Sequence, residues 1–95
     1  MAAYVYVELT ITDPEGFREY VQKAPVSIEK YGGRYLLRGR LEQDLEGKWP
    51  SQILVVLEFP SVQQANEWWN SKEYSEAKEI RHKTANSKMS IFESF

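Results

Sequence analysis

The sequence predicts one α+β domain in which a four-stranded antiparallel sheet is covered on one face by helices. Apolar residues alternate with other residues in four segments, which is the period of a β-strand. In two other segments they recur at steps of three and four residues, which is the period of an α-helix. The order is strand, helix, strand, strand, helix, strand. Two strand–helix–strand units in this order place both helices on one side of the sheet.

The first segment, Ala3 to Ile11, predicts a strand with two different faces. Its odd-numbered residues are apolar, so this side is expected to pack against the helices. The other side of the strand carries Tyr4, Tyr6, Glu8 and Thr10.

A helix is predicted to begin after Asp13. Aspartate is a favourable N-cap, and Pro14 suits the first helical position because its missing N–H has no partner there. Pro25 lies inside the pattern, so we expect a kink or a break near Lys23 and Ala24. Gly32 is expected to end the helix in a left-handed conformation. The residues at helical spacing are Phe17, Tyr20, Val21, Ala24, Ile28 and Tyr31.

The next two segments predict a hairpin. Residues 42–51 are polar and contain Gly47 and Pro50, which is typical of a loop. Gln52 to Phe59 is apolar at nearly every position, which predicts a central strand covered on both sides. In the strand from Arg34 to Leu41, simple alternation places Tyr35, Leu37 and Gly39 on one face and Arg34, Leu36, Arg38 and Arg40 on the other.

The second helical segment begins with a capping box, in which Ser61 is followed by Gln64. Asn70 and Ser71 are expected to interrupt it, with Ser71 capping a second piece that runs to about residue 85. One of Trp68 and Trp69 should fill the core while the other faces partly outward, because helical neighbours point about 100° apart. Asn86 and Ser87 are predicted to turn the chain into a last strand, residues 88–95.

Composition limits the classes of function. A chain of 95 residues fits one domain, residues 1–95, and it contains no cysteine for a disulfide or a thiolate metal site. A net charge of −2 argues against a general nucleic-acid binder. No apolar run approaches the roughly 20 residues of a membrane span, and no signal peptide is visible. We therefore expect a cytoplasmic protein with no nucleic-acid or membrane partner.

The face of the sheet away from the helices is predicted to be an interaction surface. It carries Tyr4, Tyr6, Leu36, Leu54 and Val56 beside charged residues. A sheet face with this many large apolar groups usually marks an interface. The simplest partner is a second copy of the chain, related by a two-fold axis, whose sheet faces this one.

Several motifs along the chain resemble one family. They are Thr12-Asp13-Pro14, residues 30–39, residues 57–61, residues 69–74 and Ile80-Arg81. On these motifs the chain is similar to the domain of unknown function 1330 family, within the ferredoxin-like dimeric α/β-barrel superfamily. The resemblance implies a ferredoxin-like βαββαβ fold and a homodimer, but no defined activity. The haem-degrading branch of the superfamily uses an Asn on the first strand, where this chain has Tyr and Glu, so that activity is not expected.

A charged cluster on the helix-distal face is the first candidate site. We expect the first and third strands to be parallel neighbours, which would place Glu8, Glu58, Arg34 and Arg38 together beside Tyr6. Arginine matches a carboxylate with two hydrogen bonds, and buried carboxylates must be paired or protonated. The cluster is either a pocket for a small anionic or carbonyl-bearing molecule or an ion-pair network that specifies the dimer.

The second candidate site lies on the last helix. Seven residues make almost two helical turns, so Arg81 lies near Tyr74 on the apolar side. It could anchor an anion between helix and sheet, or its stem could be buried with its head paired to a carboxylate or to helix carbonyls. Trp69 and Tyr74 could line a pocket mouth, although a role in the core or in an interface is also consistent. His82 has no metal-binding or acidic partner nearby and is expected to be solvated.

Two functions remain open from the sequence. The first is a homodimeric small-molecule binding protein or a cofactor-free enzyme, monooxygenase- or isomerase-like by analogy of fold only. The second is a structural or partner-binding dimer without a catalytic site. No zinc motif, dinucleotide fingerprint or nucleophile elbow is present, so we expect no metal or cofactor.

Overall fold

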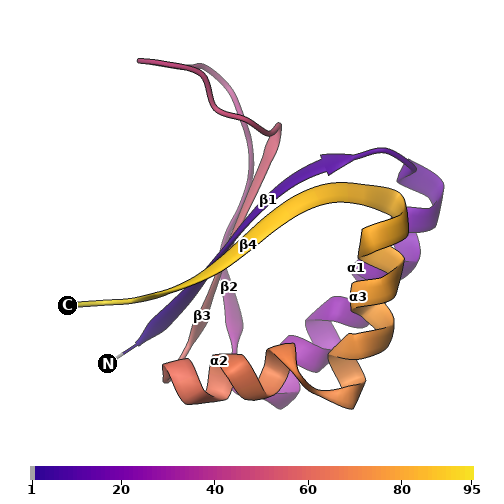
Figure 1. Cartoon of the computed structure of the whole chain (residues 1–95), viewed down its shortest axis with the longest axis vertical. Coiled ribbons are helices and arrows are strands. Elements are labelled where there is room, and N and C mark those ends of the chain that lie inside the picture. The colour runs from indigo at the N-terminus through magenta and orange to yellow at the C-terminus, as the bar shows by residue number, and fades with distance from the viewer. Residues whose placement is uncertain (1) are drawn as a thin grey trace.

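Seven elements follow one another in the predicted order, with the second helix in two pieces (Figure 1). The computed structural model describes residues 2–95. The strands are β1 (Ala3–Ile11), β2 (Arg34–Arg40), β3 (Ile53–Phe59) and β4 (Ala85–Glu93). The helices are α1 (Pro14–Lys30), α2 (Val62–Trp69) and α3 (Lys72–Thr84).

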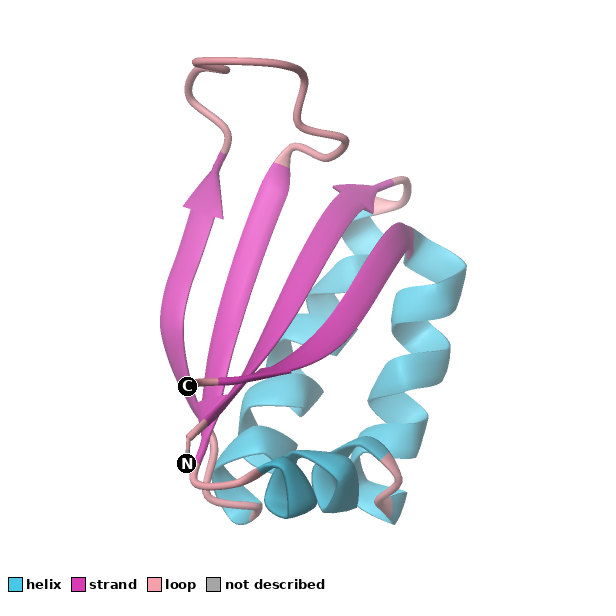
Figure 2. Ribbon diagram, turned by 60° about the vertical axis from the view of Figure 1, so that its left-hand side comes forward, coloured by secondary structure: helices cyan, strands magenta, loops and turns pink. Residues whose placement is uncertain are grey.

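The strands form one sheet in the order β2-β3-β1-β4, and every neighbouring pair is antiparallel. All three helices lie on the same face of this sheet, as Figure 2 shows. The expectation that the first and third strands are parallel is wrong. The α1 crossover returns β2 in the direction of β1, and the hairpin then reverses β3, so β3 must run against β1.

A β-bulge in β2 changes which residues of this strand share a face. Tyr35 is opposite Leu57, but the next paired residue is Leu37, opposite Val56, so Leu36 is an extra residue. Arg34 pairs with Glu58 on the helix-distal face, as predicted. After the bulge, Arg38 is opposite Val55 on the helix side, so its predicted place beside Arg34 is wrong.

Local capping explains the ends of α1. The Asp13 carboxylate accepts a hydrogen bond from Gly16 N at 3.1 Å, and Gly32 has the predicted left-handed backbone, with φ of 82°. Of the two predicted outcomes at Pro25, a break does not occur, because α1 is continuous from Pro14 to Lys30. Proline removes one intrahelical hydrogen bond, and its ring crowds the carbonyl four residues earlier. The buried residues Ala24, Ser27 and Ile28 hold the helix on the core around it.

The interruption between α2 and α3 is confirmed. Ser71 caps α3 by accepting a hydrogen bond from Tyr74 N at 3.1 Å. The predicted turn at Asn86 and Ser87 is wrong, because β4 begins directly after α3 at Ala85. The carbonyl of Thr84 accepts hydrogen bonds from the N–H groups of Thr12 and Asp13, which tie this end of α3 to the start of α1.

Trp68 is the centre of the core. Its ring centroid lies 4.1 Å from that of Tyr74 and 5.4 Å from that of Phe59, and its side chain is buried. Its Nε1–H donates to Ser27 Oγ at 3.1 Å, so one side chain joins α1, α2, α3 and β3. Trp69 is half-buried, so the two tryptophans divide the roles as predicted. No helix in residues 2–95 is long and apolar enough to span a membrane.

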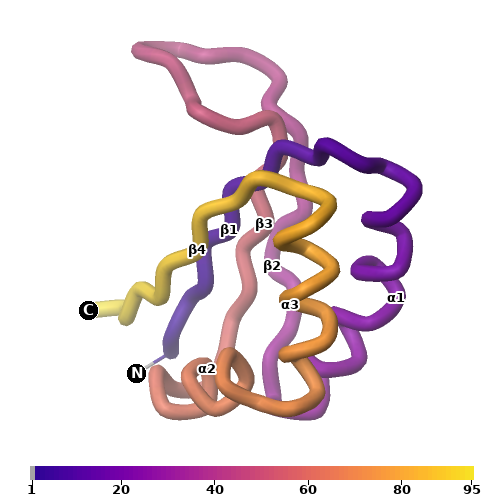
Figure 3. The backbone as a smooth tube through the Cα atoms, turned by 45° about the vertical axis from the view of Figure 1, so that its right-hand side comes forward, coloured from indigo at the N-terminus to yellow at the C-terminus, as the bar shows by residue number. Residues whose placement is uncertain are grey.

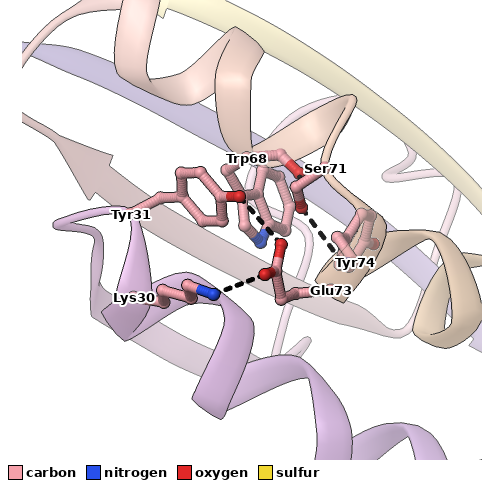
Figure 4. Close-up of polar contacts among 6 residues, drawn as sticks. All are labelled: Lys30, Tyr31, Trp68, Ser71, Glu73 and Tyr74. Carbon is pink, nitrogen blue, oxygen red and sulfur yellow. Dashed lines mark hydrogen bonds and ion pairs between the residues drawn. The ribbon is translucent and has the colours of Figure 1, made fainter.

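Helices α1 and α3 lie side by side (Figure 3) and are joined at one end by a surface cluster. In Figure 4 the Glu73 carboxylate accepts hydrogen bonds from Lys30 Nζ and, at 2.8 Å, from the Tyr31 hydroxyl. These two donors lower the pKa of Glu73 to about 2. Because the pKa is lower than in the unfolded chain, ionised Glu73 contributes stability above a pH of about 4.5, and this contribution is lost as the pH falls toward 2.

We predict that Glu73→Gln lowers the stability of the protein at pH 7 but not at pH 2. The urea midpoint of the wild type should fall more steeply than that of the variant as the pH is lowered through this window, and the two curves should converge. Glu79→Gln is the matched control, because it removes a carboxylate from the same helix that forms no ion pair within residues 2–95. A constant difference between wild type and Glu73→Gln at every pH would contradict the prediction.

Candidate functional site

A cavity of about 150 Å³ lies between α1 and the helix-facing side of the sheet. Its walls are mainly aliphatic and aromatic, and they come from α1 and from all four strands. Helix α1 packs along α3 on one side and forms one wall of this space on the other. The lining residues are Val7, Leu9, Phe17, Tyr20, Val21, Ile28, Tyr35, Arg38, Ile53, Val55, Leu57 and Met89.

Three polar side chains reach the cavity: Tyr20, Tyr35 and Arg38. The guanidinium carbon of Arg38 lies 4.8 Å from the ring centroid of Tyr35, within the range of a cation–π contact. Arg38 is exposed, so it belongs to the mouth of the cavity, whereas Tyr35 and Tyr20 are further in. Burial raises the pKa of both tyrosines. Each phenol therefore remains protonated near neutral pH and can donate a hydrogen bond.

A chain of hydrogen bonds leads from the cavity wall to a buried arginine. The hydroxyl groups of Tyr20 and Tyr74 are 2.8 Å apart, and Arg81 Nε donates to the Tyr74 hydroxyl at 3.2 Å. Arg81 Nη1 also donates to Ser87 Oγ. Because a donor polarises the hydroxyl that accepts from it, the positive charge acts through Tyr74 on Tyr20.

Arg81 has no carboxylate partner within residues 2–95. Its side chain is only 2% exposed, and its hydrogen-bond acceptors are neutral hydroxyl groups. A second cation, Lys78, donates to the carbonyl of Trp69 at 2.9 Å and lies 3.8 Å from the ring centroid of this tryptophan. Burial and the nearby Arg81 charge lower the pKa of Lys78. A buried cation without a counter-charge is unfavourable, so this part of the molecule is suited to negative charge or to oxygen lone pairs.

The predicted charged cluster is divided between two faces. Arg34 Nε donates to Glu58 Oε1 at 2.7 Å on the helix-distal face, whereas Arg38 is at the cavity on the other face. Arg34 and the Tyr4 hydroxyl lower the pKa of Glu58. Glu8 shares this face but is opposite Leu54, four positions from the Glu58 pair, about 13 Å along the strand. The expected four-residue cluster is therefore not formed within one chain.

The other candidate residues from the sequence lie outside the cavity lining, and each makes different contacts. Tyr6 is on the helix-distal face, with its ring edge toward Phe92 at 5.1 Å. Tyr74 and Arg81 belong to the buried chain of hydrogen bonds that reaches Tyr20. The ring of Trp69 packs against the Lys78 ammonium group. Of the candidates that the sequence predicts, only Arg38 lines the cavity directly. His82 is exposed, as expected.

The sequence interpretation missed Tyr20, Tyr35 and Met89 as site residues. The helical spacing predicts Tyr20 only as part of the apolar side of α1. A signal was available, because a tyrosine among buried residues requires a partner for its hydroxyl. Tyr35 and Arg38 lie side by side because of the bulge at Leu36. The alternation of apolar residues in the sequence does not indicate this bulge.

No group of three or more potential metal ligands occurs in the described residues. The cavity walls contain no carboxylate, imidazole or thiolate. Chemistry in this cavity therefore rests on phenol hydroxyls, a guanidinium group and apolar surface.

The family model for Domain of unknown function (DUF1330) matches residues 2–95. A protein of unknown function from Rhodopseudomonas palustris has 18% identity and a TM-score of 0.81, with 99% of this chain and 82% of that chain covered. No curated protein matches the sequence significantly.

Two further solved structures have lower identity. SnoaB, a cofactor-independent oxygenase from Streptomyces nogalater, has 9% identity and a TM-score of 0.65, with 99% of this chain and 92% of that chain covered. An ethyl tert-butyl ether D family protein from Bacillus halodurans has 13% identity and a TM-score of 0.68, with 100% and 99% covered. At these identities the similarity shows the fold alone, which is a ferredoxin-like α+β fold.

We predict that Arg81→Met leaves the free energy of unfolding unchanged or raises it by about 1 kcal/mol, because methionine retains the packing of the stem and removes the desolvation of the charge. Arg81→Ala should instead lower it by about 2 kcal/mol, because the stem is lost from a buried site. Urea unfolding at pH 7 measures both values. A loss of more than about 2 kcal/mol in Arg81→Met would show that the charge itself stabilises the fold.

Proposed function

The chain belongs to the DUF1330 family, a domain of unknown function, and from this premise we propose that it is a homodimeric protein that binds a small organic molecule between α1 and the sheet. The observation that carries the proposal is an apolar cavity lined by Tyr20, whose hydroxyl is hydrogen-bonded to that of Tyr74, which in turn accepts from a buried guanidinium. An apolar cavity without these groups would be only a packing defect.

The size of the cavity indicates the size of the ligand. An engineered apolar cavity of about 150 Å³ is known to bind benzene. The cavity has the same volume, about 150 Å³, so it suits a molecule with one aromatic ring. Tyr20 and Arg38 add hydrogen-bond donors, which favour a hydroxyl or carbonyl oxygen on that ring. The proposed ligand class is therefore a monocyclic phenol, quinone or related oxygen-bearing ring.

A cofactor-free enzyme is the second candidate. It is supported by the buried chain of Tyr20, Tyr74 and Arg81, which can supply a hydrogen bond to an oxygen that gains negative charge. The structural similarity to SnoaB, a cofactor-independent oxygenase, is consistent with this candidate at the level of fold. Because its pKa is raised, Tyr20 would serve as a donor and not as a base. Oxygen uptake, or isomer formation, with a ligand that binds would separate enzyme from binding protein.

The proposed dimer forms through the helix-distal face. No helix covers this face within residues 2–95, and it exposes Tyr6, Leu37 and Phe92, which are 42%, 46% and 54% exposed. The face also carries charges of both signs, since Lys88 is opposite Glu8 and Arg34 is paired with Glu58. A surface with apolar groups and both charges can complement a second copy of itself across a two-fold axis.

The Arg34–Glu58 pair supports a structural role for the charged groups on this face. The two groups are already paired within one chain, so a ligand would have to displace an existing ion pair. The sequence also leaves open a structural dimer without a ligand site. Such a dimer would require this face for its interface but would not require the cavity. The two experiments that follow test the cavity and the face separately.

We predict that the wild-type protein binds phenol and that Tyr20→Phe raises the Kd about three- to tenfold, because a net hydrogen bond contributes about 0.5–1.5 kcal/mol. Isothermal titration calorimetry measures the Kd. Tyr6→Phe is the matched control, since it removes a phenol hydroxyl from the opposite face of the sheet, and its Kd should equal that of the wild type. Failure of the wild type to bind phenol, benzoquinone or any other monocyclic probe would refute the proposed cavity function.

We predict that the wild type is a dimer at micromolar concentration and that Tyr6→Glu is a monomer, because the two-fold axis places two uncompensated carboxylates in one apolar interface. The apparent dimer Kd should rise at least about a hundredfold, which sedimentation equilibrium can measure. Val26→Glu is the control, because Val26 is 70% exposed on α1, away from this face. A monomeric wild type would rule out the proposed dimer.

A further inference from the structure

Met89 separates the cavity from a second hollow on the same side of the sheet. The second hollow has a volume of about 320 Å³ and lies between α2 and strands β1 and β4. Met89 is the only residue that lines both spaces within residues 2–95. The other lining residues of the hollow are Val5, Asn66, Trp68, Trp69, Ser90 and Ile91.

The register of the sheet places the two spaces end to end. Val5 and Val7 point to the same, helix-facing side of β1, because they are two residues apart. Val7 lines the cavity and Val5 lines the hollow. Their partners on β4 are Met89, opposite Val7, and Ile91, opposite Val5. The cavity and the hollow therefore follow one another along β1 and β4, and Met89 lies at the boundary between them.

Met89 is held weakly in this position. The Tyr74 hydroxyl lies 3.9 Å from Met89 Sδ, which is a weak sulfur contact, and the side chain is only partly buried. Methionine has three rotatable side-chain bonds and adapts to irregular spaces. The same Tyr74 hydroxyl is hydrogen-bonded to Tyr20, and Tyr20 and Met89 line the same cavity.

We propose that Met89 is the residue that determines ligand length: it restricts the cavity to one ring, and a shorter side chain at this position admits fused aromatic compounds of two rings that extend into the hollow beneath Trp69. The inference rests on the proposed function of the cavity. The joined space falls within the range of about 300–1,000 Å³ that is typical of ligand pockets. Trp68 and Trp69 give the hollow aromatic surface on which a second ring can pack.

The test compares phenol with 2-naphthol in the wild type and in Met89→Ala, with Kd values from isothermal titration calorimetry. The wild type should bind phenol at least about tenfold more tightly than 2-naphthol, and Met89→Ala should reverse this order. Met89→Val is a second variant that shortens the side chain but favours a strand, so it should show the same reversal if alanine destabilises the protein. Met89→Leu conserves the volume and should retain wild-type selectivity.

Ile91→Ala is the matched control, because Ile91 lines only the hollow. It enlarges the hollow without removing the partition, so it should leave the wild-type preference for phenol. The inference is overturned if Met89→Ala and Met89→Val retain that preference, or if Ile91→Ala reverses it to the same extent. It is also overturned if a crystal structure of Met89→Ala shows two separate spaces. In contrast, a wild type that binds neither compound nor any other monocyclic probe refutes the proposed function of the cavity, and the inference with it.

Discussion

The packing of Trp68 is the interaction on which the rest of the structure depends. Its indole ring contacts Phe59 and Tyr74, and its N–H donates a hydrogen bond to Ser27. All three helices are therefore fixed to one point near one end of the sheet. Helix α1 is held there at Ser27 and packs along α3, and the cavity lies between α1 and the strands. The helix that is fixed by Trp68 is thus also one wall of the cavity.

Much of the fold could be predicted from local sequence signals. The alternation of Ala3 to Ile11, the caps at Asp13, Ser61 and Ser71, and the left-handed Gly32 all depend on chemistry within a few residues. Two errors arose from tertiary effects: the buried neighbours of Pro25 keep α1 continuous through the proline, and Thr84 accepts a hydrogen bond from Thr12, so β4 begins without a turn. The direction of β3 follows from the order of the elements, because α1 returns β2 parallel to β1 and the hairpin then reverses the chain.

The candidate site was less predictable than the fold, and the reasons are physical. Arg81 and Tyr74 were identified because their helical spacing places them on the apolar side of α3. Arg38 was identified for its charge, but the bulge at Leu36 moves it to the opposite face from the predicted one. Tyr20 and Met89 have no sequence pattern that distinguishes them from core residues. Their importance follows from which cavity they line, and this depends on the whole arrangement of α1 against the sheet.

The bulge also has a consequence for how such proteins can diverge. Before Leu36 the odd-numbered residues of β2 face the helices, and after it the even-numbered residues do. Pairing without the bulge would place Leu36 opposite Val56 and Leu37 opposite Val55, so Leu37 would enter the cavity and Arg38 would move to the helix-distal face. A change from bulged to regular pairing could therefore alter the chemistry offered to a small molecule and the surface offered to a second copy at once. Relatives of similar backbone need not share either property, and the presence of this bulge is the first feature to compare.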